Sequence, residues 1–239
     1  MKVAKVPARP TPAERPKIAA PQASASKPEA VPAVSQTVNR AWFVVLLVVG
    51  VLLLGSTAAI AYGHTMPSWE HSIFTAINGV SLPHWVTSQL AKPISDAVYG
   101  ILALIVVLLI IPKYRTRAWQ YAVAGGSVYV FTFIVEHIID RARPAGLTHD
   151  VVLRASQGGA GFPSGHVATL AALCLTAWFF VSWPWRIGLV ILVGAEAWSR
   201  MFLGVHAPLD TVGALGSAFI VVAVLHLAPV KLRKLFFLD

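Results

Sequence analysis

Long apolar runs, separated by short polar breaks, dominate this chain. The first run covers residues 41–61, and a helix of about twenty apolar residues is as long as the hydrocarbon core of a bilayer is thick. Breaks follow at proline-containing segments. Five further runs occupy residues 94–111, 118–139, 167–182, 187–203 and 209–227. The pattern predicts an all-α protein, a bundle of six transmembrane helices.

Two segments depart from this pattern. Residues 1–39 are rich in Pro, Ala, Ser and Lys and carry no apolar periodicity, so they cannot bury enough surface to offset the entropy of ordering. We predict a disordered basic tail there and one membrane domain over residues 40–239. Residues 64–93 mix Trp69 and Trp85 with prolines and polar residues, which is typical of an amphipathic segment at the membrane interface.

The composition supports a membrane protein. Hydrophobic residues make up 56% of the chain and charged residues 12%, which leaves too little polar surface for a water-soluble core. The net charge of +9 would suggest nucleic acid in a soluble protein. Here the basic residues lie between apolar runs, where they can face lipid headgroups, so no nucleic-acid partner is expected. Cys174 is the single cysteine, which excludes an intramolecular disulfide and a cysteine zinc cluster.

Lysine and arginine are unevenly divided between the two ends of the predicted helices. Fourteen of the nineteen lie on one side: Lys2, Lys5, Arg9, Arg15, Lys17, Lys27, Arg40, Lys113, Arg115, Arg117, Arg186, Lys231, Arg233 and Lys234. The other five are Lys92, Arg141, Arg143, Arg154 and Arg200. Because cytoplasmic loops carry the basic excess, we predict cytoplasmic termini. The compact chain suggests a bacterial cytoplasmic membrane, with the opposite side facing the periplasm or the outside.

Three short polar segments fall on that outer side: two contain histidines, at residues 163–166 and 199–210, and the third is residues 141–144. The first is residues 163–166, Pro-Ser-Gly-His, at the start of the fourth run. A helix N-terminus offers unpaired N–H groups, Ser164 adds a hydroxyl donor, and Gly165 allows close approach to the backbone. These features suit a phosphate oxygen. The alternative is a serine N-cap that needs no ligand.

The second segment contains His206 and Asp210, which flank a proline at the start of the last run. A carboxylate that accepts the proton of one ring nitrogen leaves the other nitrogen free to attack. Asp210 would then orient a nucleophilic His206. The alternative is an interfacial histidine capped by an aspartate.

Arginine completes the pattern. Arg143 precedes a proline after the third run, and Arg200 lies near the end of the fifth. A guanidinium is always charged and its fork of donors matches phosphate oxygens. The alternative for each is a side chain that extends to lipid headgroups.

Taken together, these motifs resemble those of the type 2 phosphatidic acid phosphatase (PAP2) superfamily, in its membrane lipid phosphate phosphatase branch. The family has Pro-Ser-Gly-His, followed by Ser-Arg, five residues, His, three residues and Asp. Both blocks are complete here, at residues 163–166 and 199–210. The resemblance implies that His206 forms a phosphohistidine, that His166 protonates the leaving group, and that Asp210 steadies His206.

The resemblance also implies a phosphate site made by Arg143, Ser164, Gly165 and Arg200, with no metal and no cofactor. A metal site formed by His166, His206 and Asp210 lacks the usual ligand pairings. The first family block departs from the pattern. Seven residues before Arg143 the family has lysine, whereas this chain has Glu136. Arg141 is one candidate replacement for that charge; Glu136 could instead pair with an arginine or with a cationic group on the substrate.

The expected function is hydrolysis of a lipid-linked phosphate or diphosphate, such as undecaprenyl diphosphate, a phosphatidate-type lipid or phosphorylated lipid A. Two alternatives stay open. One is phosphotransfer from a polyprenyl diphosphate to another lipid, and the other is a non-catalytic lipid-binding homologue. The expected partners are the lipid substrate and membrane lipids, and the sequence does not indicate an oligomeric state.

Overall fold

The computed structural model describes Ala4 and residues 40–235. Within these residues every regular element is helical and no strand occurs, so the all-α prediction is confirmed for this part of the chain. The predicted tail, residues 1–39, lies outside the described residues apart from Ala4, and its disorder stays a prediction.

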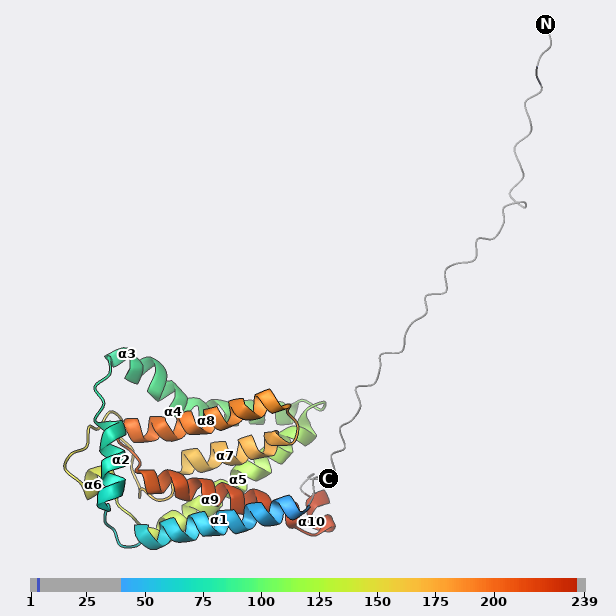
Figure 1. Ribbon diagram of the computed structural model, residues 1–239. Coiled ribbons are helices and arrows are strands. Elements are labelled where there is room, and N and C mark those ends of the chain that lie inside the picture. The colour runs from blue at the N-terminus through green and yellow to red at the C-terminus, as the bar shows by residue number, and fades with distance from the viewer. Residues whose placement is uncertain (1–3, 5–39, 236–239) are drawn as a thin grey trace. The chain divides into compact units, whose positions relative to one another are not determined.

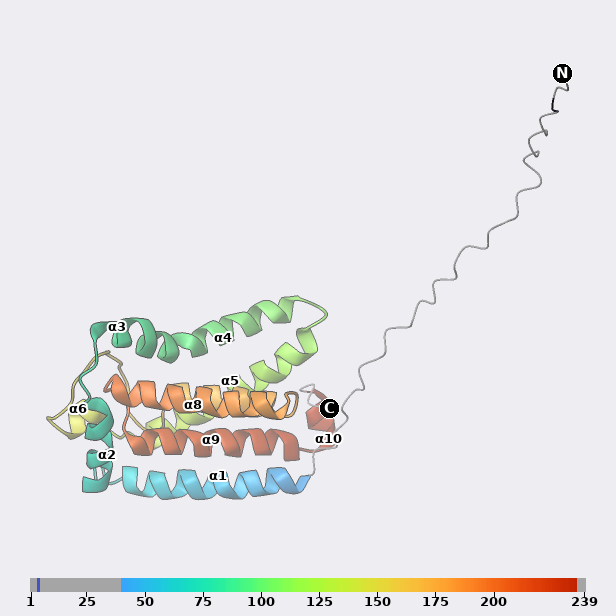
Figure 2. The same ribbon diagram turned by 45° about the horizontal axis from the view of Figure 1, so that its top comes forward.

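Six long helices lie side by side (Figures 1 and 2). Each overlaps one predicted apolar run, with ends that differ by no more than four residues. They are α1 (Arg40–Ala61), α4 (Lys92–Ile110), α5 (Arg115–Ile139), α7 (Gly165–Trp178), α8 (Trp183–Phe202) and α9 (Pro208–Leu227).

Short helices lie at the two ends of this bundle. At one end α2 (Ser68–Asn78) lies across the long helices, with α6 (Pro144–Leu147) close by, and α10 (Val230–Leu235) lies at the other end (Figure 1). Trp69 of α2 is exposed, as the predicted interfacial position requires. The placement of α2 at the membrane surface stays a prediction.

The second half of the predicted interfacial segment is different. The short helix α3 (His84–Val86) and the π-helical turn η2 (Thr87–Ala91) lead directly into α4. The prediction that all of residues 64–93 lie outside the spanning helices is therefore corrected: the helical segment His84–Ile110 is continuous and apolar enough to span. The mixture of tryptophan, proline and polar residues suggested an interfacial segment, yet the π-turn η2 leads into the first turn of α4, where a proline is tolerated.

Four helical segments in the described residues have the length and composition to cross a membrane: Arg40–Ala61, His84–Ile110, Arg115–Leu147 and Pro208–Leu227. The predicted count of six is not reached by this criterion. The 14-residue α7 extends only about 21 Å at 1.5 Å per residue, short of a hydrocarbon core of about 30 Å. The helix α8 is the second long helix that does not meet this criterion, and it carries the charged residues Arg186, Glu196 and Arg200.

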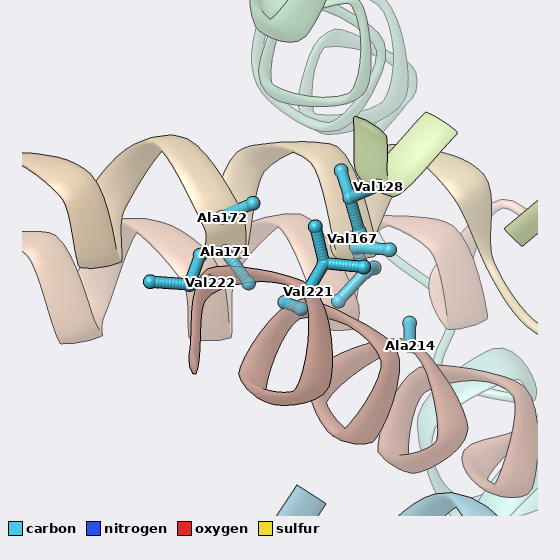
Figure 3. Close-up of a cluster of buried hydrophobic side chains, with 9 residues drawn as sticks. Val128, Val167, Ala171, Ala172, Ala214, Val221 and Val222 are labelled. Atoms are coloured by element: carbon cyan, nitrogen blue, oxygen red, sulfur yellow. The ribbon is translucent and has the colours of Figure 1, made fainter. Parts of the chain in front are cut away.

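The centre of the bundle is built from small apolar side chains. Figure 3 shows valines and alanines of α5, α7 and α9 meeting in one cluster. Nine of the fourteen residues of α7 are buried, so this helix lies inside the bundle. Small side chains let helix backbones approach closely, which is how helices pack in a membrane where lipid removes most of the hydrophobic driving force.

The tightest helix contact joins α1 to α9. A Cβ atom on Gly50 would lie 2.9 Å from the carbonyl oxygen of Gly216, and a Cβ on Gly216 would lie 2.6 Å from the backbone nitrogen of Leu54. Only glycine permits this approach. The contact fixes the start of α9, which carries Asp210, relative to the first helix of the bundle.

All three polar motifs lie at one end of the bundle, because the helices alternate in direction. That end holds the last residue of α5, the first residue of α7, the end of α8 and the start of α9 (Figure 1). The basic residues predicted to be cytoplasmic lie at the other end, in the loop 111–114 and the start of α5, in the first turn of α8 and in α10: Lys113, Arg115, Arg117, Arg186, Lys231, Arg233 and Lys234. The sequence prediction that the motifs share one face is thus confirmed in its geometry.

Candidate active site

His206 lies in the loop between α8 and α9 and is 2% exposed. Its Nδ1 is 2.8 Å from the carbonyl oxygen of Gly161, and its Nε2 is 3.2 Å from Nη1 of Arg143. A carbonyl only accepts, so Nδ1 carries the proton. A guanidinium only donates, so Nε2 carries the lone pair. Two independent contacts therefore select the same neutral tautomer.

The charge state of His206 agrees with this tautomer. Burial, followed by the nearby charges of Arg200 and Arg143, holds the pKa of the imidazole well below its usual 6.5. At neutral pH the ring is uncharged. Its Nε2 is an unprotonated nitrogen on the wall of a cavity of about 220 Å³, which His166, Gly165, Glu136 and Arg143 also line.

Asp210 was expected to accept the ring proton of His206. In the structure its Oδ2 is 3.5 Å from Nδ1 and accepts the backbone N–H of Ala207 at 2.7 Å. The shorter contact of Nδ1 goes to Gly161. Asp210 therefore acts mainly by fixing the loop that carries His206 and by placing a negative charge beside it.

Asp210 belongs to a buried charge network with Arg141 and Glu70. Nη1 of Arg141 donates to Oδ1 of Asp210 at 3.0 Å and to Oε1 of Glu70 at 3.1 Å. Nη2 donates to Oε2 of Glu70 at 2.5 Å and to the carbonyl oxygen of Thr65 at 2.8 Å. Glu70 also accepts the N–H of Leu209 at 3.0 Å. The network ties α2 to the start of α9.

This network corrects one expectation about Arg141. Its side chain is 0% exposed, and it lines neither of the two cavities beside His206. Arg141 is committed to two carboxylates, so it does not replace the missing family lysine in the pocket.

Arg143 holds the loop opposite α7. Its Nε and Nη2 donate to the carbonyl oxygens of Gly158 and Gly159, and its Nη1 donates to the carbonyl oxygen of Val205 at 2.8 Å as well as contacting His206. A guanidinium keeps its charge at any physiological pH. Arg143 thus supplies a fixed positive charge next to Nε2 of His206.

The N-terminus of α7 forms the facing wall. Ser164 occupies the N-cap position, but its hydroxyl makes no capping bond. The hydroxyl oxygen is buried, and among the described residues this oxygen has no hydrogen-bond partner. A Cβ on Gly165 would meet nothing within 4 Å. The serine therefore does not act as the simple N-cap of the alternative interpretation, and the first turn of α7 opens onto free space.

His166 and Arg200 lie on the other side of this wall. The ring of His166 packs edge-on against Tyr99 at 5.0 Å. Arg200 is buried and donates to Ser95 and to the amide oxygen of Gln157. It lines a second cavity of about 360 Å³. His166, Tyr99 and Gln157 line both cavities, so the two arginines face adjoining spaces with His166 between them.

Except for Arg141, the predicted site residues thus lie together around the two cavities or beside His206. The structure adds three residues that the sequence prediction did not include. Glu70 pairs with Arg141, Gln157 holds Arg200, and Gly161 accepts the proton of His206. Gln157 and Gly161 belong to the glycine-rich residues 157–161, which lie just before the Pro-Ser-Gly-His segment and could have pointed to them, whereas Glu70 gave no signal. Within Ala4 and residues 40–235, no three His, Cys, Asp or Glu side chains gather as metal ligands do.

Comparison with known proteins agrees with this arrangement. Residues 117–234 match the sequence model of the PAP2 superfamily. Undecaprenyl-diphosphatase BcrC of Bacillus subtilis is 27% identical over 162 residues, which cover 64% of this chain and 80% of that protein.

Two solved structures share the fold. The PAP2-type phosphatidylglycerolphosphate phosphatase of Bacillus subtilis superimposes with a TM-score of 0.59 at 20% identity, over 75% of this chain and 92% of that chain. LpxE of Aquifex aeolicus gives a TM-score of 0.55 at 23% identity, over 64% and 91% of the two chains.

Proposed function

This chain is an integral membrane protein of the PAP2 superfamily, and from that premise we propose that it hydrolyses a lipid-linked phosphate or diphosphate through a phosphohistidine on His206. The undecaprenyl-diphosphatase and the transmembrane phosphatidylglycerolphosphate phosphatase that resemble it support a lipid phosphate substrate. One observation carries the proposal: the buried His206 is held as the tautomer with a free Nε2 lone pair, and that nitrogen lines a cavity next to a fixed guanidinium.

The proposed first step is an in-line attack on phosphorus. A bond forms between Nε2 of His206 and phosphorus, the bond from phosphorus to the leaving oxygen breaks, and His166 gives that oxygen its proton. Arg143 now donates to Nε2, so an incoming phosphate must draw this guanidinium onto its own oxygens. That exchange frees the lone pair only when substrate is present.

The second step releases phosphate. Water attacks the phosphohistidine, His166 accepts a proton from that water, and the phosphorus–nitrogen bond breaks. The first-turn N–H groups of α7 and the hydroxyl of Ser164 are suited to stabilise the charge on the phosphoryl oxygens, because such donors are fixed before the reaction begins. Each step balances without a metal ion.

A lipid substrate fits the shape of the site. The helices α4 and α5 pack together near their connecting loop, around Ile105 and Ala118, and diverge toward the His206 end (Figure 2). Between them, Tyr99 and Leu102 of α4 and Tyr129 of α5 line the cavity. These residues lie one to three helical turns inside the apolar segments, so the cavity extends from the polar end toward the lipid-facing surface.

We further propose that all six long helices span the membrane, with the basic loops in the cytoplasm and His206 on the outer side. A cysteine introduced at the exposed Asp150, near α6, should react with a membrane-impermeant maleimide in intact cells. One at Lys113 should react only after permeabilisation. The parent, whose Cys174 is buried, is the unlabelled control. Labelling of Lys113→Cys in intact cells would reverse the proposed orientation.

The pH profile tests the assigned chemistry. Since protonation removes the lone pair of His206, activity must fall as pH drops through the pKa of this ring. That pKa is held well below 6.5, so the acid limb of kcat/KM should lie well below pH 6.5.

The measurement is release of inorganic phosphate in detergent from undecaprenyl diphosphate, phosphatidate and phosphatidylglycerolphosphate, with and without EDTA. We expect activity that EDTA does not reduce. A profile that is flat across the acid and neutral range contradicts the roles of the two histidines. Turnover that requires an added acceptor lipid would favour phosphotransfer over hydrolysis.

A further inference from the structure

Glu136 lies on the wall of the same cavity as His206, Arg143 and the first turn of α7. It is half-buried. Among the described residues it forms no hydrogen bond and no ion pair within 4 Å. One carboxylate oxygen lies so close to Gly159 that a Cβ there would be 2.8 Å from it. The charge of Glu136 acts on Arg143 through space, but among the described residues no cationic group lies within ion-pair distance of this carboxylate.

The position of Glu136 is unfavourable for its own helix. It lies in the last turn of α5, which ends at Ile139, where the unpaired carbonyl groups make the helix end negative. A carboxylate there is destabilising, whereas a lysine would be stabilising. A residue that destabilises its own helix and makes no hydrogen bond or ion pair with the described residues is better explained by binding a ligand than by stabilising the fold.

The two walls of the cavity have opposite electrostatic character. On one wall, the first turn of α7 at Gly165 and the guanidinium of Arg143 attract an anion. On the other, Glu136 and the negative end of α5 attract a cation. The cavity holds only about 220 Å³, so a ligand that satisfies both walls must carry its two charges close together.

A simpler role would be to balance the charge of Arg143. Glu136 does act on Arg143 through space, but two observations and one physical argument weigh against charge balance as its whole role. The guanidinium of Arg143 already donates to the carbonyl oxygens of Gly158, Gly159 and Val205. Glu136 is not within 4 Å of it. A negative charge in a phosphate site also weakens phosphate binding, so charge balance alone would reduce the affinity for substrate.

We propose that Glu136 binds an ammonium group next to the scissile phosphate, so that the substrate is a long-chain phosphate monoester with an amine about two carbons from the ester oxygen. This inference rests on the proposed phosphatase activity and narrows its substrate class. The phosphate lies against α7 and Arg143, the ammonium against Glu136, and the chain leaves between α4 and α5.

The test compares two lipids that differ only at the nitrogen, which is a charged ammonium in sphingosine 1-phosphate and an uncharged acetamide in N-acetylsphingosine 1-phosphate. The parent should favour the ammonium lipid in kcat/KM by about tenfold or more, the value of a hydrogen-bonded charge pair. Glu136→Gln should lose most of this preference by slowing the ammonium lipid alone. Glu136→Lys should favour the N-acetyl lipid.

The matched control is Asp140→Asn. Asp140 is exposed, lies one turn further along the chain and does not line the cavity. Its φ of 45° suits asparagine, so the variant removes a nearby negative charge without strain. It should keep the preference of the parent.

The possible failures are distinguishable. If the parent hydrolyses both lipids equally, or if Glu136→Gln changes both by the same factor, the ammonium site is wrong and the phosphatase activity stands. If no lipid phosphate, including undecaprenyl diphosphate and phosphatidate, gives release that depends on His206, the proposed function fails and the ammonium site fails with it.

Discussion

Replacing His206 with alanine is expected to reduce phosphate release by about 10⁴-fold or more, the loss typical when a covalent nucleophile is removed. Nε2 of His206 is the unprotonated ring nitrogen on the cavity wall, between Arg143 and the first turn of α7. Without it the phosphoryl group has no acceptor. The measurement is phosphate release in detergent from the best lipid of the parent.

A second substitution separates chemistry from folding. His206→Asn retains an N–H that can donate to Gly161, so the loop keeps its main contact, yet an amide does not attack phosphorus. It should be as inactive as the alanine variant and as stable as the parent. The matched control is His84→Ala, which removes an exposed histidine and should leave activity unchanged. Activity in His206→Asn within tenfold of the parent would overturn the nucleophile assignment.

Replacing Arg141 with methionine is expected to destabilise the folded protein by about 3–5 kcal/mol. The substitution keeps the side-chain length but leaves two fully buried carboxylates, Glu70 and Asp210, without the cation that now donates to both. Four of the network contacts connect segments about seventy residues apart in sequence. For a domain of this size the loss corresponds to a fall of about 10 °C in the unfolding midpoint.

The control for this prediction is Arg143→Met. Arg143 donates mostly to backbone carbonyls at the cavity edge and has no carboxylate in an ion pair with it among the described residues. Its loss should lower activity with little change in the midpoint. Heating in detergent followed by size-exclusion chromatography gives both values. Equal midpoints for the two variants would show that the buried network contributes no more to stability than an arginine at the cavity edge.

The sequence predicted the helices well because their signal is local. Apolar runs of membrane length, broken at prolines, located every long helix to within four residues. The error came at residues 84–93, where α3 and a π-turn extend the helix of α4 into the segment predicted to lie at the interface. Helix type at a single turn depends on packing against neighbours, which a residue pattern does not encode.

The site residues that belong to the recognisable motifs could be predicted from the sequence. His166, His206, Arg143 and Arg200 meet around two adjoining cavities, as motifs on alternating helices at one end of a bundle should. Glu70 was not predictable, because a single carboxylate seventy-one positions before Arg141 carries no spacing signal. For the same reason the sequence left Arg141 as a pocket residue, whereas burial and two carboxylate partners make it structural.

The arginine shared by Glu70 and Asp210 also sets an order of assembly during biosynthesis. Glu70 is synthesised early and belongs to the segment after the first helix, whereas Asp210 opens the last long helix. Arg141 cannot be buried with both charges compensated until that last helix has entered the bilayer. A nascent chain arrested before α9 therefore lacks a mature catalytic centre, so phosphate-releasing activity begins only when insertion is complete.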